Sequence, residues 1–345
     1  MRLVDNIFNS MLEKKSAPAI SAAVQDLDNT AENYNPEVMA WLNSTSWYKG
    51  NPNYITFEEA AAVTSDQFSE IPNAQKRAIV TFDEAKYFTS VTYLRNYAFY
   101  NCKLLERITL QNTLTSIGYQ AFRDCTSLAL TSLPSSITSI GDSAFKGCTS
   151  LALTSLPSSI TSISGSAFYG CTSLVLTSLP SGITSIGDYA FYGCTSLALT
   201  LLPSGLTSIG IYAFNGCTSL ALTSLPNGIT SISNSAFDGC TALALTSLPN
   251  GLTTIGVQAF QSCLTLKDTL HEIPSSVTEL GDRAFRYVKF PSLKFLGLTP
   301  PTFGTQSICA LPKEVDCQVP GASLAEYKEA MKVLTDEGLV IISTY

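Results

Sequence analysis

Charged residues and histidine are scarce in this chain. Only 14% of its 345 residues are charged, and its one histidine is His271. Between residues 121 and 263 the charged residues are Arg123, Asp124, Asp142, Lys146, Asp188 and Asp238. General acid–base catalysis needs titratable groups held close together, and scattered single charges do not provide that. We therefore expect a protein that is not an enzyme and has no catalytic residues.

Basic residues are not in excess, and long apolar runs are missing. The formal net charge is −7, which gives no reason to expect nucleic acid or an anionic membrane as a partner. No apolar run approaches the ~20 residues of a membrane-spanning helix, so we expect no membrane insertion. Residues 1–6 lack the features of a secretory signal peptide. We expect either that a signal was removed or that the protein uses another export route.

The most prominent feature of the sequence is a repeat of 23 residues. The dipeptide Ala-Phe recurs with its phenylalanine at positions 99, 122, 145, 168, 191, 214, 237 and 260, and Phe285 follows after 25 residues. Cysteine keeps the same period at Cys102, Cys125, Cys148, Cys171, Cys194, Cys217, Cys240 and Cys263. A fixed period of this length is the signature of a solenoid, in which each coil buries its apolar residues against its neighbours. We predict about nine coils.

Each part of the repeat suggests a local structure. The segments Leu-Thr-Ser-Leu and Ile-Thr-Ser-Ile predict two short strands per coil, joined by a Leu-Pro-Ser-Gly or Leu-Pro-Asn-Gly turn. The segment Gly-x-x-Ala-Phe-x-Gly-Cys shows no strand alternation, and we interpret it as a short helical turn. Its phenylalanine should fill the interior. We expect a stack that includes Phe145, Phe168, Phe191 and Phe214.

The cysteines invite a metal or disulfide interpretation, which their spacing opposes. Zinc sites use pairs two to four residues apart, and the eight repeated cysteines are each 23 residues from the next. One cysteine per coil at one phase favours a small buried apolar residue. We therefore expect neither metal nor cofactor. Cys309 and Cys317 lie outside the series, and a disulfide between them stays open for an oxidising environment.

The chain divides into three predicted regions. Residues 1–80 carry helical patterns and form a mainly helical N-terminal cap or attachment region, with a degenerate helix-loop-helix motif that lacks carboxylates at the ligand positions. Residues 81–305 form the solenoid. Residues 306–345 form a C-terminal cap, in which Ser323 and Glu326 suggest a capping box at the start of an amphipathic helix.

The repeat resembles a known family. The frame C-x-x-L-x-x-I-x-L-x-x-x-L-T-S-I-G-x-x-A-F stands almost intact from Cys102 to Phe122 and is similar to the BspA-like leucine-rich repeats of surface proteins from gut and oral bacteria. The resemblance covers roughly residue 81 to the C-terminus. From Cys125 onward the middle of the repeat departs from it, because threonine stands where the frame has isoleucine. The resemblance implies an α+β leucine-rich-repeat solenoid with a right-handed superhelix and short strands.

Two surface features remain. Threonines at one phase should form a row of hydroxyls, at Thr138, Thr161, Thr184, Thr207, Thr230 and Thr253. The repeats differ mainly at the two residues before Ala-Phe and the one after it. There the middle coils place the candidate binding residues, Tyr169, Tyr189, Tyr192 and Tyr212. Tyrosine is favoured in recognition surfaces. The alternative is that some of these rings pack against neighbouring coils.

Three functions are compatible with these features. The resemblance implies an adhesion or binding module, located outside the cell or on its surface, whose partner is a protein or glycan on a cell or matrix. A phage virion component, such as a tail or head fibre exposed on the virion surface, is the second hypothesis. A passive structural spacer is the third. Fold alone does not decide among them, because function depends on sites carried by the fold.

Overall fold

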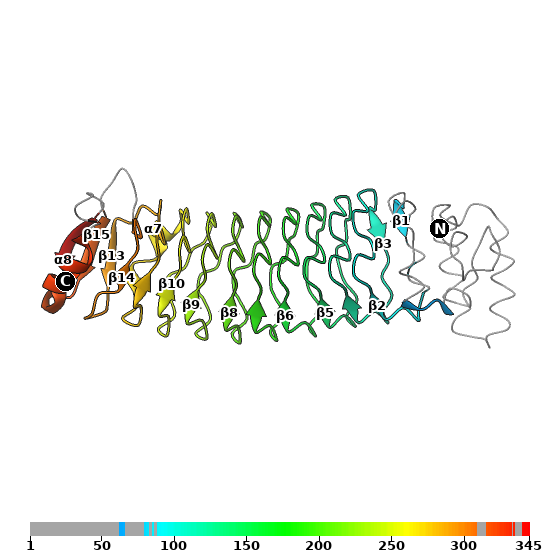
Figure 1. Cartoon of the computed structure of the whole chain (residues 1–345), viewed down its shortest axis with the longest axis horizontal. Helices are drawn as coiled ribbons and strands as arrows, with labels where there is room; N and C mark the ends of the chain where they lie inside the picture. Colours follow the sequence, from blue (N-terminus) through cyan, green and yellow to red (C-terminus); the bar gives the residue numbers. More distant parts are fainter. Residues whose placement is uncertain are drawn as a thin grey trace, which may run out of the picture.

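The coils stack along one axis into an elongated rod (Figure 1). The structure is a computed structural model and describes residues 62–65, 79–82, 85, 88–308, 315–332, 334 and 340–345. The N-terminal region predicted for residues 1–80, with its helix-loop-helix motif, lies outside the described residues apart from 62–65 and 79–80. Cys309 also lies outside them. The rod has about 11 turns, where the Ala-Phe count predicted nine, because turns at both ends lack that motif.

One side of each coil carries a two-residue parallel strand. These strands are β2 (Tyr93–Leu94), β4 (Ser116–Ile117), β5 (Ser139–Ile140), β6 (Ser162–Ile163), β7 (Ser185–Ile186), β8 (Ser208–Ile209), β9 (Ser231–Ile232), β10 (Thr254–Ile255), β12 (Glu279–Leu280) and β14 (Thr302–Phe303). Equivalent residues pair within three separate sheets, β2–β4–β5, β6–β7–β8 and β9–β10–β12–β14, as Ser185 does with Ser208 and Ile186 with Ile209. In the repeated Ser-Ile strands the isoleucine points into the core and the serine stays outside. The strand predicted at Ile-Thr-Ser-Ile is confirmed.

The second strand predicted for each coil, at Leu-Thr-Ser-Leu, is wrong for the middle repeats. Its buried leucines, Leu151, Leu153 and Leu156, are spaced by two and then three residues, so the chain bends where a strand would alternate. Strands on this side occur only toward the ends of the rod among the described residues: β1 (Thr81–Phe82), β3 (Arg107–Ile108), β11 (Glu272–Ile273), β13 (Ser292–Phe295), β15 (Val315–Val319) and β16 (Val340–Thr344). Ile108 of β3 is buried, whereas Thr154 at the same phase is exposed.

A column of phenylalanine rings forms the centre of the core. Nine rings, one per coil from Phe99 to Phe285, stack with centroids 5.2–5.7 Å apart and planes within 11° of parallel. All of them have no solvent-exposed surface. The stack includes Phe145, Phe168, Phe191 and Phe214. Leucines and isoleucines of the same coils surround it.

The cysteines form a second buried column beside the rings. All eight are free thiols with no exposed surface. From Cys125 to Cys263, each Sγ donates to the carbonyl oxygen of the phenylalanine one coil earlier, as Cys194 does to Phe168 O at 3.0 Å. Burial raises the pKa of the Cys171 and Cys194 thiols well above the usual value. The column therefore joins successive coils and keeps its sulfur atoms in the unreactive thiol form.

Three short helical segments lie in the C-terminal part of the chain: α7 (Leu266–Thr269), the 3-10 turn η2 (Gly321–Ser323) and α8 (Leu324–Ala330). At the C-terminal end β11, β13, β15 and β16 form one parallel sheet in that order, and α8 contacts β16. Tyr327 of α8 is buried and its hydroxyl donates to Gly297 O at 3.0 Å. Cys317 of β15 is a buried free thiol.

The capping box predicted at Ser323 and Glu326 is wrong. Ser323 precedes α8, but its side chain makes no capping hydrogen bond. The reason is local, because Ser323 already belongs to the 3-10 turn η2 and its backbone N–H donates to Pro320 O at 2.9 Å. The chain thus enters α8 through a tight turn rather than through a side-chain cap.

Replacing Phe191 with alanine should strongly destabilise the rod. Phe191 is fully buried and stacks on Phe168 at 5.5 Å and on Phe214 at 5.4 Å, so its loss leaves a cavity between two rings. We expect the free energy of unfolding to fall by about 3–5 kcal/mol, measured by denaturant titration. A loss below ~1 kcal/mol would contradict a packed phenylalanine column.

The buried column of cysteines leads to a second prediction, about the reactivity of the thiols. In the native protein at pH 8, Cys171 and Cys194 should react slowly with a thiol reagent, because burial keeps them protonated and out of reach. All ten cysteines should react after denaturation in guanidinium chloride. Rapid native labelling of either residue, followed by peptide mapping, would contradict the buried column, and so would stoichiometric zinc.

Candidate functional site

The variable residues of the repeat lie in a segment that we call the turn face, which in one coil spans residues 187–193. The short helical turn predicted here is wrong. Three overlapping turns replace it, with Ala190 N donating to Gly187 O at 3.3 Å, Tyr192 N to Tyr189 O at 3.2 Å and Cys194 N to Phe191 O at 3.1 Å. The first and third turns each have a central residue in the left-handed region, with φ of +56° at Tyr189 and +68° at Gly193. The positive φ values reverse the chain where a helix would continue.

The backbone N–H groups that form no hydrogen bond within these turns donate to carbonyl oxygens of the next coil. Tyr189 N donates to Ile211 O at 2.8 Å, Phe191 N to Ala213 O at 2.8 Å and Gly193 N to Asn215 O at 2.7 Å. Donation alternates, because the intervening N–H groups bond within their own coil. The same set recurs one coil earlier, where Phe168 N donates to Ala190 O. The backbone of the turn face is therefore held as rigidly as a sheet, and its side chains project from fixed positions.

Four tyrosines gather on the turn face of three successive coils. Tyr169 stacks on Tyr192 with ring centroids 4.5 Å apart, and Tyr189 stacks on Tyr212 at 4.9 Å. The two stacks touch each other, since Tyr189 lies 6.1 Å from Tyr192. We call this group the tyrosine cluster. Ring faces are covered within the stacks, so Tyr169, Tyr192 and Tyr212 are half-buried, and Tyr189 is 37% exposed. The rings therefore pack between coils, as the second alternative expected, and they also form part of the surface.

Polar groups border the cluster on both sides. Lys146 Nζ lies 4.4 Å from the centroid of the Tyr169 ring, a cation–π contact. In the following coils Asp238 accepts hydrogen bonds from Asn215 Nδ2 and Gln261 Nε2, each at 3.3 Å. Burial raises the pKa of the Asp238 carboxyl, while the two amides lower it. The cluster thus ends in a cation on one side and an amide–carboxylate ladder on the other.

A smaller aromatic group occupies the same phases nearer the N-terminus. Tyr97 meets Tyr100 at 5.9 Å and Tyr119 at 5.3 Å, both edge to face. The Arg123 guanidinium lies 5.7 Å from the centroid of the Tyr100 ring. This group offers a matched comparison for the tyrosine cluster, because Tyr97 and Tyr100 occupy the phases of Tyr189 and Tyr192.

Sequence inspection missed a set of side-chain caps on the turn face. In each of them, the side-chain oxygen of an Asn or Asp accepts a hydrogen bond from the backbone N–H of the residue at the same position in the next coil. These pairs are Asn96 with Tyr119 N (2.9 Å), Asp188 with Ile211 N (2.7 Å), Asn234 with Val257 N (2.9 Å) and Asp282 with Thr305 N (2.6 Å). Asn or Asp stands at this phase in alternate coils, at residues 96, 142, 188, 234 and 282, and four of these five residues form the cap. A search at twice the repeat period would have found the signal, because Asx recurs at residues 96, 142, 188 and 234.

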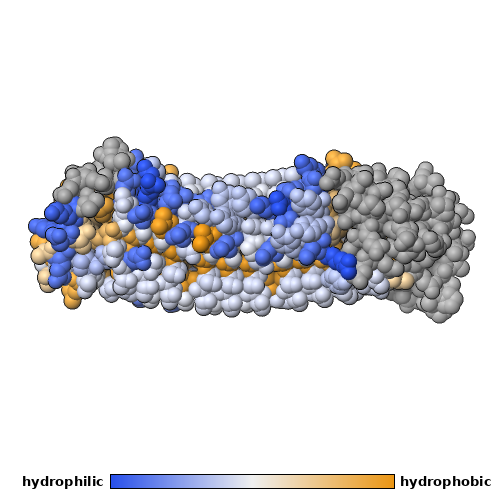
Figure 2. Space-filling view, viewed as in Figure 1, coloured by the Kyte–Doolittle hydropathy of each residue, from blue (hydrophilic) through white to orange (hydrophobic). Residues whose placement is uncertain are grey.

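The predicted threonine row exists on the strand side of the rod and is exposed. Its hydroxyls are engaged in the structure, as Thr207 Oγ1 donates to Thr184 O at 3.2 Å and Thr253 Oγ1 to Thr230 O at 3.0 Å. The backbone N–H of each donates to the same carbonyl. The row is therefore part of the ladder between coils. Figure 2 shows a mostly weakly hydrophilic surface over the middle coils, with a narrow apolar line along the rod.

The residues that the structure describes contain no group of three or more His, Cys, Asp or Glu side chains placed to hold a metal ion. None of the described helices has the length and apolar character needed to cross a membrane.

A parallel-strand solenoid with one phenylalanine and one thiol per coil defines a leucine-rich-repeat protein. The chain belongs to the BspA type leucine rich repeat region family, whose model matches residues 79–197 and 163–292 in six copies. No curated protein matches the sequence.

Solved structures with a similar fold come from bacteria. A leucine-rich repeat protein from Bacteroides ovatus is 22% identical, with 77% of this chain and 88% of that chain covered and a TM-score of 0.39. A leucine rich cell surface protein from Faecalibacterium prausnitzii is 23% identical, with 74% and 77% covered and a TM-score of 0.39. The pneumococcal vaccine antigen PcpA is 20% identical, with 74% and 76% covered and a TM-score of 0.44.

Asp238 should make stability depend on pH in a defined direction. Burial raises its folded-state pKa above the ordinary value of an aspartate. Its contribution to the free energy of unfolding is therefore present below that ordinary pKa and is lost as pH rises through the folded pKa. Asparagine does not ionise, so the Asp238→Asn variant does not lose this stability as pH rises. The melting temperature of the variant relative to the wild type should therefore increase between pH 3 and pH 7, measured by circular dichroism. A difference that stays constant with pH would contradict the shift.

Proposed function

We propose that this protein is a non-catalytic binding or adhesion module that contacts a protein or glycan partner through the tyrosine cluster. The observation that supports this most is that four tyrosine rings gather on the turn face, where the otherwise nearly uniform repeats differ in sequence. Tyr169, Tyr189, Tyr192 and Tyr212 stand on a rigid backbone and are flanked by Lys146. Large, pre-ordered aromatic side chains anchor interfaces at low entropic cost.

The threonine row is a weaker candidate for recognition. Its residues are the same in every middle coil, and four of the six hydroxyls donate to the backbone of the preceding coil. A uniform row carries little information by which one partner is distinguished from another. The turn face varies from coil to coil and therefore can be specific.

Charge predicts how such binding responds to salt. Over the coils of the cluster the charged residues are few, and Lys146 is already placed over an aromatic ring. Binding through the cluster should therefore depend weakly on ionic strength, unlike electrostatically steered association. In the same proposal the protein acts outside the cell or at its surface, as its family resemblance implies. A virion component and a passive spacer have no supporting observation in the fold.

The test is the triple variant Tyr189→Ser, Tyr192→Ser and Tyr212→Ser. Serine already occupies the left-handed position of the turn at Ser166 and Ser235, so the backbone should tolerate it. We expect a melting temperature close to that of the wild type and at least a tenfold loss of binding to bacterial cells, host matrix proteins or a glycan array.

The matched control is Tyr97→Ser with Tyr100→Ser, which removes aromatic rings at the same phases outside the cluster. It should leave binding unchanged. Unchanged binding by a folded triple variant would exclude the cluster as the contact surface, and attachment would then have to lie elsewhere on the chain.

A further inference from the structure

Two arginines share one coil of the turn face toward the C-terminal end of the rod. Arg283 occupies the phase of Tyr189 and Arg286 the phase of Tyr192, two positions whose rings lie 6.1 Å apart in their own coil. The backbone is held in the same way here, with φ of +57° at Arg283 and its N–H donating to Thr305 O at 2.9 Å. We call these two residues the arginine pair. Its side chains therefore project from neighbouring, fixed positions.

The positive charge of the pair is not neutralised by an ion pair. Within the part of the chain that the structure describes, neither guanidinium forms a salt bridge or a hydrogen bond. Acidic side chains of these coils are engaged elsewhere. Asp268 pairs with Lys267, Glu272 pairs with Lys294, and Asp282 accepts a backbone N–H of the next coil. The pair is thus a local concentration of positive charge on a chain whose formal net charge is −7.

The Arg286 guanidinium is oriented and has unused donors. Its Cζ lies 4.6 Å from the centroid of the Tyr287 ring, a cation–π contact that holds the side chain against the turn face. Its Nε is buried and has no acceptor, and Gln306 Oε1, in the next coil, is a buried acceptor without a donor. Buried polar atoms without partners are rare and costly. An oxyanion that accepts two N–H groups from one guanidinium would satisfy such a donor.

The neighbours of the pair limit how much negative charge a ligand can carry. Uncharged amides flank it, with Gln258 and Gln261 one coil earlier, joined by a hydrogen bond of 3.2 Å, and Gln306 one coil later. Carboxylates lie close by at Asp282 and, further along the turn face, at Asp238. A polyanion or a run of acidic residues would bring additional negative charges toward these carboxylates. One anionic group on a neutral chain avoids this repulsion, and hydroxyls beside it suit the amides.

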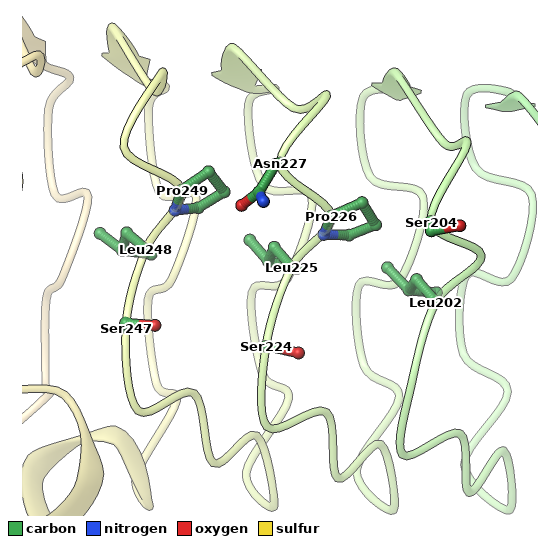
Figure 3. A pocket seen from close by; sticks show the side chains of 9 residues that line it. All are labelled: Leu202, Ser204, Ser224, Leu225, Pro226, Asn227, Ser247, Leu248 and Pro249. Atoms are coloured by element: carbon green, nitrogen blue, oxygen red, sulfur yellow. The ribbon is translucent and has the colours of Figure 1, made fainter.

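The shallow depression on another segment of the coils lacks this character. Figure 3 shows the side chains that line it, between residues 202 and 249, and none of them is charged. Leu225 and Leu248 are only 6% and 4% exposed, so the depression offers little apolar surface. The arginine pair, by contrast, specifies the charge of what it can bind.

We propose that the arginine pair binds a single carboxylate or sulfate group on an otherwise neutral glycan. Guanidinium groups match both oxyanions with paired N–H···O hydrogen bonds, and the flanking amides would bind neighbouring sugar hydroxyls. The pair lies on the turn face three coils beyond Tyr212. It is therefore a site separate from the tyrosine cluster and does not rest on the function proposed for that cluster.

Surface plasmon resonance of the full chain over immobilised probes tests this. The probes are sialyllactose, which carries one carboxylate, sulfated lactose, which carries one sulfate, neutral lactose, and a hexaglutamate peptide as the rival class. We expect one or both anionic sugars to bind at least about tenfold more tightly than lactose. Binding should weaken as salt increases from ~0.05 to ~0.5 M, because the ion pairs form at the surface. Comparing the two anionic sugars shows which oxyanion is recognised.

The test variant is Arg283→Gln with Arg286→Gln. Glutamine already stands at both phases one coil earlier, as Gln258 with φ of +55° and as Gln261, so the backbone should tolerate the change. We expect an unchanged melting temperature and a loss of affinity for the anionic sugar of about tenfold or more. The double lysine variant should retain part of the affinity, because an ammonium keeps the charge but not the paired hydrogen-bond geometry.

The matched control is Arg123→Gln, which removes a guanidinium at the phase of Arg286 that is already paired with Asp124 at 3.3 Å. This control and the tyrosine triple variant should both bind the anionic sugar as the wild type does. Equal binding of lactose, a preference for hexaglutamate, equal loss in the control or no binding of either anionic sugar would overturn the proposal. Loss in the tyrosine triple variant alone would also overturn it and would place the glycan at the tyrosine cluster.

Discussion

The whole rod depends on one constraint, which is that the backbone donors of each coil find their acceptors in the next coil. Strand N–H groups, alternate N–H groups of the turn face and the threonine ladder all cross from coil to coil. A donor left over in one coil would be buried without a partner, so neighbouring coils must keep the same register along the segments that pair. The phenylalanine and cysteine columns fill the interior that this register creates. Even the thiols follow it, because each donates to the carbonyl of the preceding coil.

Much of the fold could be predicted because packing leaves a period in the sequence. The Ala-Phe repeat predicted a continuous buried column, and Ile-Thr-Ser-Ile predicted the paired strand. The second strand failed because exposed Thr154 stands where buried Ile108 supports β3 nearer the N-terminus. The change from isoleucine to threonine could be seen in the sequence. Its effect on the backbone could not be predicted, because a short apolar segment is compatible with either a strand or an irregular bend.

The candidate site was harder to predict than the core. The variable tyrosines could be found from the sequence, but their mutual stacking could not, because it depends on how side chains project from left-handed turn residues. Tyr189 and Tyr212 occupy positions where glycine or asparagine would have indicated a positive φ.

The side-chain caps of the turn face divide the rod into pairs of coils. Asp188 caps the coil that carries Ile211. Because the capping position of that coil is the apolar Ile211, it does not cap the next coil, and Asn234 then starts the pattern again. Deleting a single coil between them would bring Asp188 and Asn234 into adjacent coils and break the alternation. Deleting or duplicating 46 residues, the interval from 188 to 234, would preserve it. The unit in which such a gene can lengthen or shorten its product without disturbing the turn face is therefore two repeats, not one.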